Sequence, residues 1–349
     1  MMWPRGVGVL EQKAGPDGVE LTILGKDRTV LANVGTIPVK DPSQQGGIAY
    51  SWADTERVVF AYSDSTGEQA QNTWTLYSWN VAGGPLTAIA HNPTDASGHP
   101  YGGGWIHPYV TGDRLYWIQA TASVPGYPDL PSGSELMQHD FTTGRTSVLY
   151  SGLTEAYVVY HQDILFTALP QTPNGKRDPL TGKPIEVMRA IETVTGQAVA
   201  PPGGITAATD HPDFIVTNGD LIVWDTGNGG LRGWRPSWGK SIDVLPGLDQ
   251  RIAKWPDSDS PNAPRLWGPY LLWQAPQTYL LDLRTNTFTR LNTHRGSSEM
   301  DGSLLSIWQY TEDKKPTDFK ALHGMQYAID LAKLPGPLQC TSRPDTLSG

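Results

Sequence analysis

The side chains that could do chemistry gather in a few short segments. His99 and His107 flank a run of three glycines and Trp105, and His211 lies two residues before Asp213. An imidazole beside a carboxylate can move protons in acid–base catalysis. Aromatic faces can instead bind a sugar ring, a peptide or a cation. These segments therefore point to two chemistries, ligand binding and proton transfer.

Two further segments add candidates of the same types. Trp52 lies two residues before Asp54, and Trp255 precedes two aspartates. The predicted ligand-binding residues are Trp52, His99, Trp105, His107, His211 and Trp255. The predicted acid–base residues of an enzyme, if the chain is one, are Asp54, His107, His211 and Asp213.

Other catalytic chemistries find little support. A metal site needs three or four ligands that converge, and the histidines and carboxylates have no tight ligand spacing, so no metal and no cofactor are predicted. No Gly-x-Ser-x-Gly nucleophile motif occurs. The one cysteine, Cys340, cannot form an intramolecular disulfide and has no activating histidine nearby in the sequence.

Composition indicates the kind of element that carries these residues. Glycine and proline make up about 19% of the 349 residues, against about 12% on average, and both break helices. Charged residues are only 17%, and the 13 tryptophans and 14 tyrosines exclude a disordered chain. The net charge of −9 argues against nucleic acid as a partner. An all-β protein rich in turns is predicted.

A repeat of about 50 residues runs along the chain. Its clearest part is a strongly apolar strand, the second of each unit, predicted at 57–62, 114–118, 163–167, 220–224, 269–273 and 303–308. A further partial copy stands at the N-terminus. Four short strands per 40 to 50 residues are typical of a propeller blade.

We therefore predict an all-β, β-propeller fold with seven four-stranded blades, or six if the N-terminal copy completes the last blade. Residues 1–340 are predicted to form a single domain, and residues 341–349 a flexible C-terminal tail. Trp117, Trp224, Trp273 and Trp308 recur in the second strands, so they are predicted to belong to the core between blades.

The second unit carries a resemblance to a known family. Its segments Thr55-Glu-Arg-Val-Val-Phe-Ala-Tyr-Ser-Asp64 and Thr75-Leu-Tyr-Ser-Trp-Asn-Val-Ala-Gly-Gly-Pro-Leu-Thr87 resemble the β-propeller repeats of TolB-like proteins. The resemblance is to the superfamily, whose members mostly serve as binding platforms, while some are enzymes.

Loop lengths suggest which side of the propeller is functional. The predicted connections from second to third strands (63–73, 120–134, 169–184 and 310–324) are long, and so are those between blades (38–47, 91–104, 200–213 and 246–264). Loops of this length in a compact domain are usually functional or disordered. The face with the long loops, around the central channel, is therefore the predicted working surface.

The predicted function is binding of a peptide, glycan or small-molecule ligand, or interaction with a protein. The alternative is a propeller hydrolase or lyase that acts on a glycan or another polar substrate. No apolar stretch is long enough to span a membrane. The start of the chain and its composition favour an extracellular or cell-envelope location, within a larger membrane-anchored or exported protein, with the cytoplasm as the alternative.

Overall fold

The computed structural model describes the chain over several ranges. They are residues 2–3, 6–7, 9–25, 29–39, 46–53, 56–63, 73–101, 106–124, 127–154, 156–168, 187–202, 205, 214–225, 231–245, 264–275, 277–285, 287–291, 296–310, 324–334 and 336. Two compact units divide the chain. The first comprises Met1–Glu155 and Gln162–Val199, and the second comprises Ala156–His161 and Ala200–Gly349.

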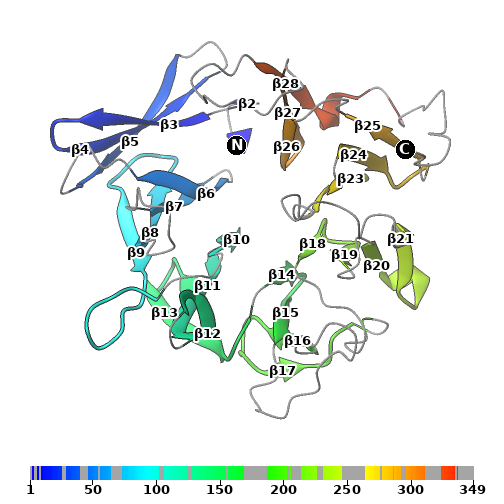
Figure 1. The fold of residues 1–349 in the computed structure, drawn as a ribbon, viewed down its shortest axis with the longest axis horizontal. Coiled ribbons are helices and arrows are strands. Elements are labelled where there is room, and N and C mark those ends of the chain that lie inside the picture. The colour runs from blue at the N-terminus through cyan, green and yellow to red at the C-terminus, as the bar shows by residue number, and fades with distance from the viewer. Residues whose placement is uncertain are drawn as a thin grey trace. The chain divides into compact units, whose positions relative to one another are not determined.

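The first unit consists of antiparallel strands joined in chain order (Figure 1). One sheet is β1 (Met2–Trp3) with β2 (Gly6–Val7), and the next is β3 (Val9–Gly15), β4 (Gly18–Leu24) and β5 (Val30–Ile37). A four-stranded sheet follows with β6 (Gly47–Ala53), β7 (Arg57–Ser63), β8 (Trp74–Asn80) and β9 (Thr87–His91). Another is β10 (Tyr109–Thr111), β11 (Arg114–Val124), β12 (Tyr127–Asp140) and β13 (Arg145–Ser151). The strands β15 (Asp163–Ala168), β16 (Val187–Glu192) and β17 (Ala198–Val199) come next.

The second unit repeats the same pattern. It contains β14 (Tyr157–Tyr160), and then β18 (Ile215–Thr217), β19 (Ile222–Asp225), β20 (Leu231–Trp234) and β21 (Ile242–Leu245). A further sheet is β22 (Arg265–Trp267), β23 (Tyr270–Ala275), β24 (Gln277–Asp282) and β25 (Thr287–Arg290). The last is β26 (Gly296–Asp301), β27 (Leu304–Tyr310) and β28 (Gly324–Asp330). Short 3-10 helices, η1 (Pro236–Trp238) and η4 (Leu331–Lys333), follow β20 and β28.

The predicted second strands are confirmed. They correspond to β7, β11, β15, β19, β23 and β27, each of which starts within two residues of its predicted position. In the described part of the chain every sheet of three or four strands runs in chain order. This simple up-and-down order is the one expected of propeller blades.

The second strands are apolar throughout because both of their faces are covered. Val58 and Phe60 of β7 pack in a cluster with residues of β4 and β5. Val59 and Ala61, which point to the other face, pack with Leu115 of β11. Successive side chains of a strand point to opposite faces, so β7 joins the core on each side of its sheet.

The strand β23 has the same arrangement in the second unit. Leu271 and Trp273 pack with Val223 of β19, whereas Tyr270 and Leu272 pack with residues of β26 and β27. In each unit, consecutive sheets are thus stacked face to face. Stacked four-stranded meanders are the blade arrangement that the repeat predicts, and the fold class is all-β.

Short hairpins join the first and second strands of several sheets. Thr111 pairs with Arg114, Trp267 with Tyr270, and Asp301 with Leu304, which leaves two residues in each turn. Each of these turns has a glycine with positive φ, as such hairpins require. We call the end of each sheet that holds these hairpins the tight-turn end; the turns from third to fourth strands lie at the same end. The opposite end of each sheet is called the long-loop end.

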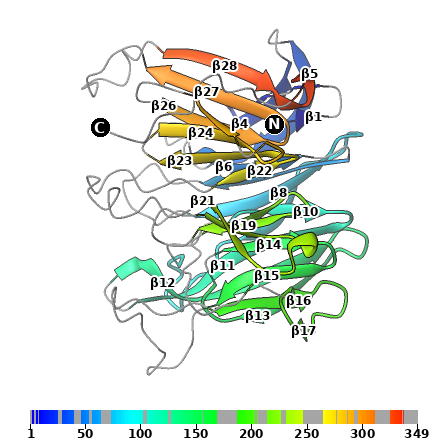
Figure 2. The same ribbon diagram turned by 90° about the vertical axis from the view of Figure 1, so that its right-hand side faces the viewer.

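One predicted loop is wrong. A long loop is predicted at 120–134, between a second and a third strand, but β11 and β12 continue through most of this segment (Figure 2). Ala120 pairs with Ser134 and Ser123 with Pro131, with irregular register in between. Since β13 pairs only with Glu135–Asp140, Pro131 lies where β12 has no β13 neighbour, and proline is tolerated on such an edge.

The predicted core tryptophans are buried where they are described. The exposed fraction is 0% for Trp117, 3% for Trp224 and 6% for Trp273. The side chain of Trp308 lies outside the described residues. No helix among the described residues is long and apolar enough to cross a membrane. The extent of the domain, the tail at 341–349 and the number of blades stay predictions.

Candidate functional site

The first strands of two neighbouring sheets place two aromatic rings in contact. Tyr50 lies on β6 opposite Ala61, and His107 lies just before β10, near Ile118. Their ring centroids are 4.8 Å apart and the rings are tilted by 56°. Both residues are half-buried. The contact lies toward the long-loop end, where the sequence predicted the working surface.

The backbone of His107 explains how its ring reaches Tyr50. Ile106 and Val110 both belong to the core cluster between the two sheets, so regular alternation would turn His107 to the opposite face. Its φ of 33° is positive, a conformation that non-glycine residues rarely adopt and that histidine tolerates better than most. This local irregularity re-aims the side chain toward Tyr50, which packs against the same cluster as Ile106.

Trp52 is the third member of what we call the first-strand aromatic group, Tyr50, Trp52 and His107. It lies opposite Val59 and packs, half-buried, against the same core cluster. Because residues two apart on a strand share a face, Trp52 follows Tyr50 along β6. The sequence singled out Trp52 and His107 but missed Tyr50, whose type is common in strands and whose partner comes from another sheet.

His99 lies apart from this group, in an ordered turn between β9 and β10. Its side chain is 78% exposed and its Nδ1 lies 3.7 Å from a carboxylate oxygen of Asp95. The same carboxylate accepts hydrogen bonds from the backbone N–H groups of Ser97 and His99, which lowers the pKa of Asp95. His99 is thus accessible to solvent, at the end of a hydrogen-bonded turn.

Buried Asn92 holds the start of this segment. Its Oδ1 accepts a hydrogen bond from the backbone N–H of Trp74 at 2.9 Å, and its Nδ2 donates to the carbonyl of Tyr101 at 3.1 Å. A bridge between Thr94 and Pro100 closes the loop. A long loop that is fixed in this way can present a side chain in one orientation.

A second polar group, missed from the sequence, lies on β11 and β12. The Trp117 indole donates to Gln119 Oε1 at 3.2 Å, and Gln119 Nε2 donates to Glu135 Oε2 at 3.0 Å. Gln119 and Glu135 are directly paired across the two strands. Gln119 and Glu135 stand immediately outside the predicted connection 120–134, and nothing in the sequence around either residue indicates that the two are paired.

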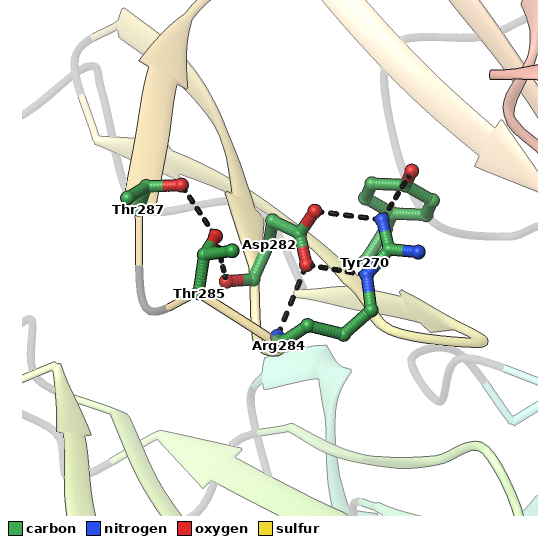
Figure 3. Close-up of polar contacts among 5 residues, drawn as sticks. All are labelled: Tyr270, Asp282, Arg284, Thr285 and Thr287. Carbon is green, nitrogen blue, oxygen red and sulfur yellow. Dashed lines mark hydrogen bonds and ion pairs between the residues drawn. The ribbon is translucent and has the colours of Figure 1, made fainter. Parts of the chain in front are cut away.

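The tight-turn end holds a different kind of polar cluster, shown in Figure 3. Asp282, fully buried, accepts hydrogen bonds from Arg284 Nε at 2.9 Å and from a terminal guanidinium nitrogen at 2.7 Å. That nitrogen also donates to the hydroxyl of Tyr270 at 2.7 Å, and the guanidinium lies 5.0 Å from the Tyr270 ring. The hydrogen bonds with Asp282 raise the pKa of Arg284. The cluster fixes the turn between β24 and β25.

Equivalent turns elsewhere show that this role is structural. The side chains of Asn80 and Asp140 likewise accept backbone N–H groups two residues further on. Arg57 binds Asp113 Oδ1 at 2.9 Å, and its guanidinium lies 4.4 Å from the Phe141 ring. These polar side chains at the tight-turn end therefore close turns and join neighbouring sheets.

Several predicted site residues lie outside the described residues. They are Asp54, Trp105, His211, Asp213 and Trp255. Their roles, and the convergence of acid–base groups, stay predictions. Among the described ranges no group of three or more histidine, cysteine, aspartate or glutamate side chains could hold a metal ion.

Comparison with known proteins shows the fold. No protein-family model and no curated protein matches the chain. A prolyl endopeptidase structure matches with a TM-score of 0.52 at 14% identity, over 94% of this chain and 46% of that chain. The oligogalacturonate lyase of Vibrio parahaemolyticus matches with a TM-score of 0.51 at 12% identity, over 94% of this chain and 88% of the lyase chain. TolB from Acinetobacter baumannii has a TM-score of 0.42 at 14% identity, over 93% of this chain and 77% of the TolB chain.

The prolyl endopeptidase and the oligogalacturonate lyase are β-propeller proteins. Together with the stacked antiparallel meanders, they show that the chain is a β-propeller, as the repeat predicted. At these identities the likeness concerns the fold alone. These two neighbours are an endopeptidase and a lyase, and a fold can carry unrelated functions, so function has to be argued from the site.

Proposed function

We propose that this chain is a ligand-binding β-propeller whose first-strand aromatic group contacts the ligand. The observation that carries the proposal is the contact between Tyr50 and His107 across two sheets. It is maintained by a positive φ at His107, and unfavourable backbone conformations of this kind concentrate at functional sites. Aromatic side chains that are only half-buried keep part of their surface for a partner.

The chemistry of the group suits a ligand with a flat apolar face and a polar edge. Tyr50 and Trp52 offer ring surface, and the His107 imidazole can donate or accept a hydrogen bond. Sugar rings and peptides have both features. The extracytoplasmic location and the enzyme alternative, with Asp54, His107, His211 and Asp213 as acid–base groups, stay predictions.

Binding to a glycan array and a peptide array tests the proposal. His107→Asn keeps a residue that tolerates positive φ but removes the imidazole, and Trp52→Ala removes ring surface. Each is expected to weaken binding of an array hit at least about tenfold. His161→Gly is the matched control, because His161 lies in a turn at the tight-turn end. The absence of any hit, or hits that both variants retain, would overturn the proposal.

The same hits distinguish binding from catalysis. Each glycan or peptide that binds is incubated with the wild-type chain and analysed by mass spectrometry. An intact ligand supports a binding protein. Cleavage that His107→Asn abolishes would replace the proposal with the hydrolase or lyase alternative.

A further inference from the structure

Glu135 is a carboxylate that is held in place without a positive partner among the described residues. Its side chain is half-buried, and its hydrogen bond to Gln119 is the single polar contact made by that side chain among the described residues. Gln119 is in turn fixed by the Trp117 indole. An amide orients a carboxylate but leaves its charge in place, and a charge removed from water is normally paired.

Strand alternation places this carboxylate at the same boundary between sheets as the first-strand aromatic group. Met137 and Trp117 belong to the cluster between the sheet of β6–β9 and the sheet of β10–β13. Glu135 and Gln119 are two residues from them on regularly paired strands, so they share that face. They lie further toward the long-loop end, beyond the apolar cluster.

Among the described residues, the facing sheet contributes no charge at this height. Val59 and Ala61 of β7 belong to the shared cluster, and Ser63, the next residue on that face, is neutral. Tyr50 is paired with Ala61 and contacts His107. The boundary thus combines a fixed carboxylate on one sheet with an aromatic surface on the other.

Resting on the proposed function, we infer that the ligand carries a guanidinium or ammonium group that Glu135 binds, while Tyr50 contacts its apolar part. A carboxylate with an aromatic face beside it is the usual environment for an organic cation, because charge pairing and cation–π attraction act together. The net charge of −9 favours the approach of such a ligand over long distances.

The test compares two isosteric tripeptides that differ in charge. Acetyl-Ala-Arg-Ala-amide and its citrulline counterpart are titrated into the full chain by calorimetry at low salt. Propylguanidine is titrated as well, as a guanidinium without a peptide and with the same single charge as the arginine side chain. The arginine peptide is expected to bind at least about tenfold more tightly than the citrulline peptide. Binding of propylguanidine would indicate that the cation is sufficient. Tighter binding of the arginine peptide than of propylguanidine would indicate that the peptide backbone contributes as well.

Glu135→Gln keeps the shape of the side chain and is expected to abolish the preference for arginine. Glu20→Gln, an exposed position on β4, changes the net charge equally and should preserve it. Equal binding of both peptides by the wild type, no binding of either, or a preference that survives Glu135→Gln, would overturn the inference. If glycan or neutral-peptide hits still depend on His107 and Trp52, the proposed function stands while this inference fails.

Discussion

Tyr50 on β6 and His107 just before β10 occupy matching places in adjacent sheets, and their ring centroids are 4.8 Å apart. The match follows from register: Tyr50 pairs with the fifth residue of β7, and the residue before His107 bonds to the fifth residue of β11. A repeat places equivalent residues at equivalent heights in neighbouring sheets. The ring contact is therefore a consequence of the repeat, completed by the unusual backbone of His107.

The turn residue His161 should tolerate glycine better than a branched residue. Its φ of 54° matches those of Gly112 (56°) and Gly268 (52°) in the equivalent hairpins. His161→Gly relieves the backbone but loses the ring contact with Tyr160, so the free energy of unfolding should change by less than about 1 kcal/mol. His161→Val should cost about 1–2 kcal/mol. Urea unfolding of the wild type and the two variants measures both free-energy changes. An equal loss of stability in the two variants would contradict a backbone conformation at His161 that favours glycine.

The buried carboxylate of Asp282 should need Arg284. Arg284→Met leaves that carboxylate without its guanidinium, whereas Asp282→Asn together with Arg284→Met leaves no buried charge. We expect the single Arg284 variant to have a lower melting temperature than the double variant. Differential scanning calorimetry tests the order, and a double variant that is less stable than Arg284→Met would show that the charge is not the cause.

Acid should destabilise the protein through His139. Burial lowers the pKa of its imidazole, and the charge of Asp140 only partly opposes this; Nδ1 lies 2.9 Å from the Thr146 hydroxyl. Below pH 6.5, the ordinary pKa of histidine, this histidine takes up a proton in the unfolded chain but not in the folded chain. Its contribution to stability is therefore full above pH 6.5 and falls as the pH decreases toward the pKa of the folded state.

The measurement is the melting temperature between pH 8 and pH 5. His139→Gln should flatten the part of the curve below pH 6.5 by a few degrees. A wild-type slope in the His139 variant would rule out this histidine as the source. Carboxylates with lowered pKa, such as Asp140, act only at more acidic pH.

Trp117 should be among the most sensitive core positions. Its side chain is fully buried and its indole donates to Gln119. Trp117→Ala should cost about 3–5 kcal/mol of unfolding free energy, measured by urea unfolding. Trp52→Ala, at a half-buried position, should cost less than about 2 kcal/mol. A larger loss at Trp52 would mean that this residue belongs to the core rather than to a binding surface.

The sequence by itself determined the strands and their repeat. Apolar runs such as Arg57–Ser63 and Tyr270–Ala275 were predictable because a strand covered on both faces has to be apolar at every position. The 50-residue spacing then indicated the propeller. The prediction of a loop at 120–134 was wrong. Proline and glycine are typical of loops, and yet they are tolerated on the edges of a two-stranded extension.

Only the tertiary structure decided which of these residues meet. Tyr50 and His107 are 57 positions apart in the sequence, and nothing in either neighbourhood predicts a positive φ at His107. The bond between Gln119 and Glu135 depends on a register that irregular pairing near Ala122 could have shifted. A strand's pattern determines which face a side chain takes, but its partners are set by how neighbouring sheets stack and by how single residues bend the backbone.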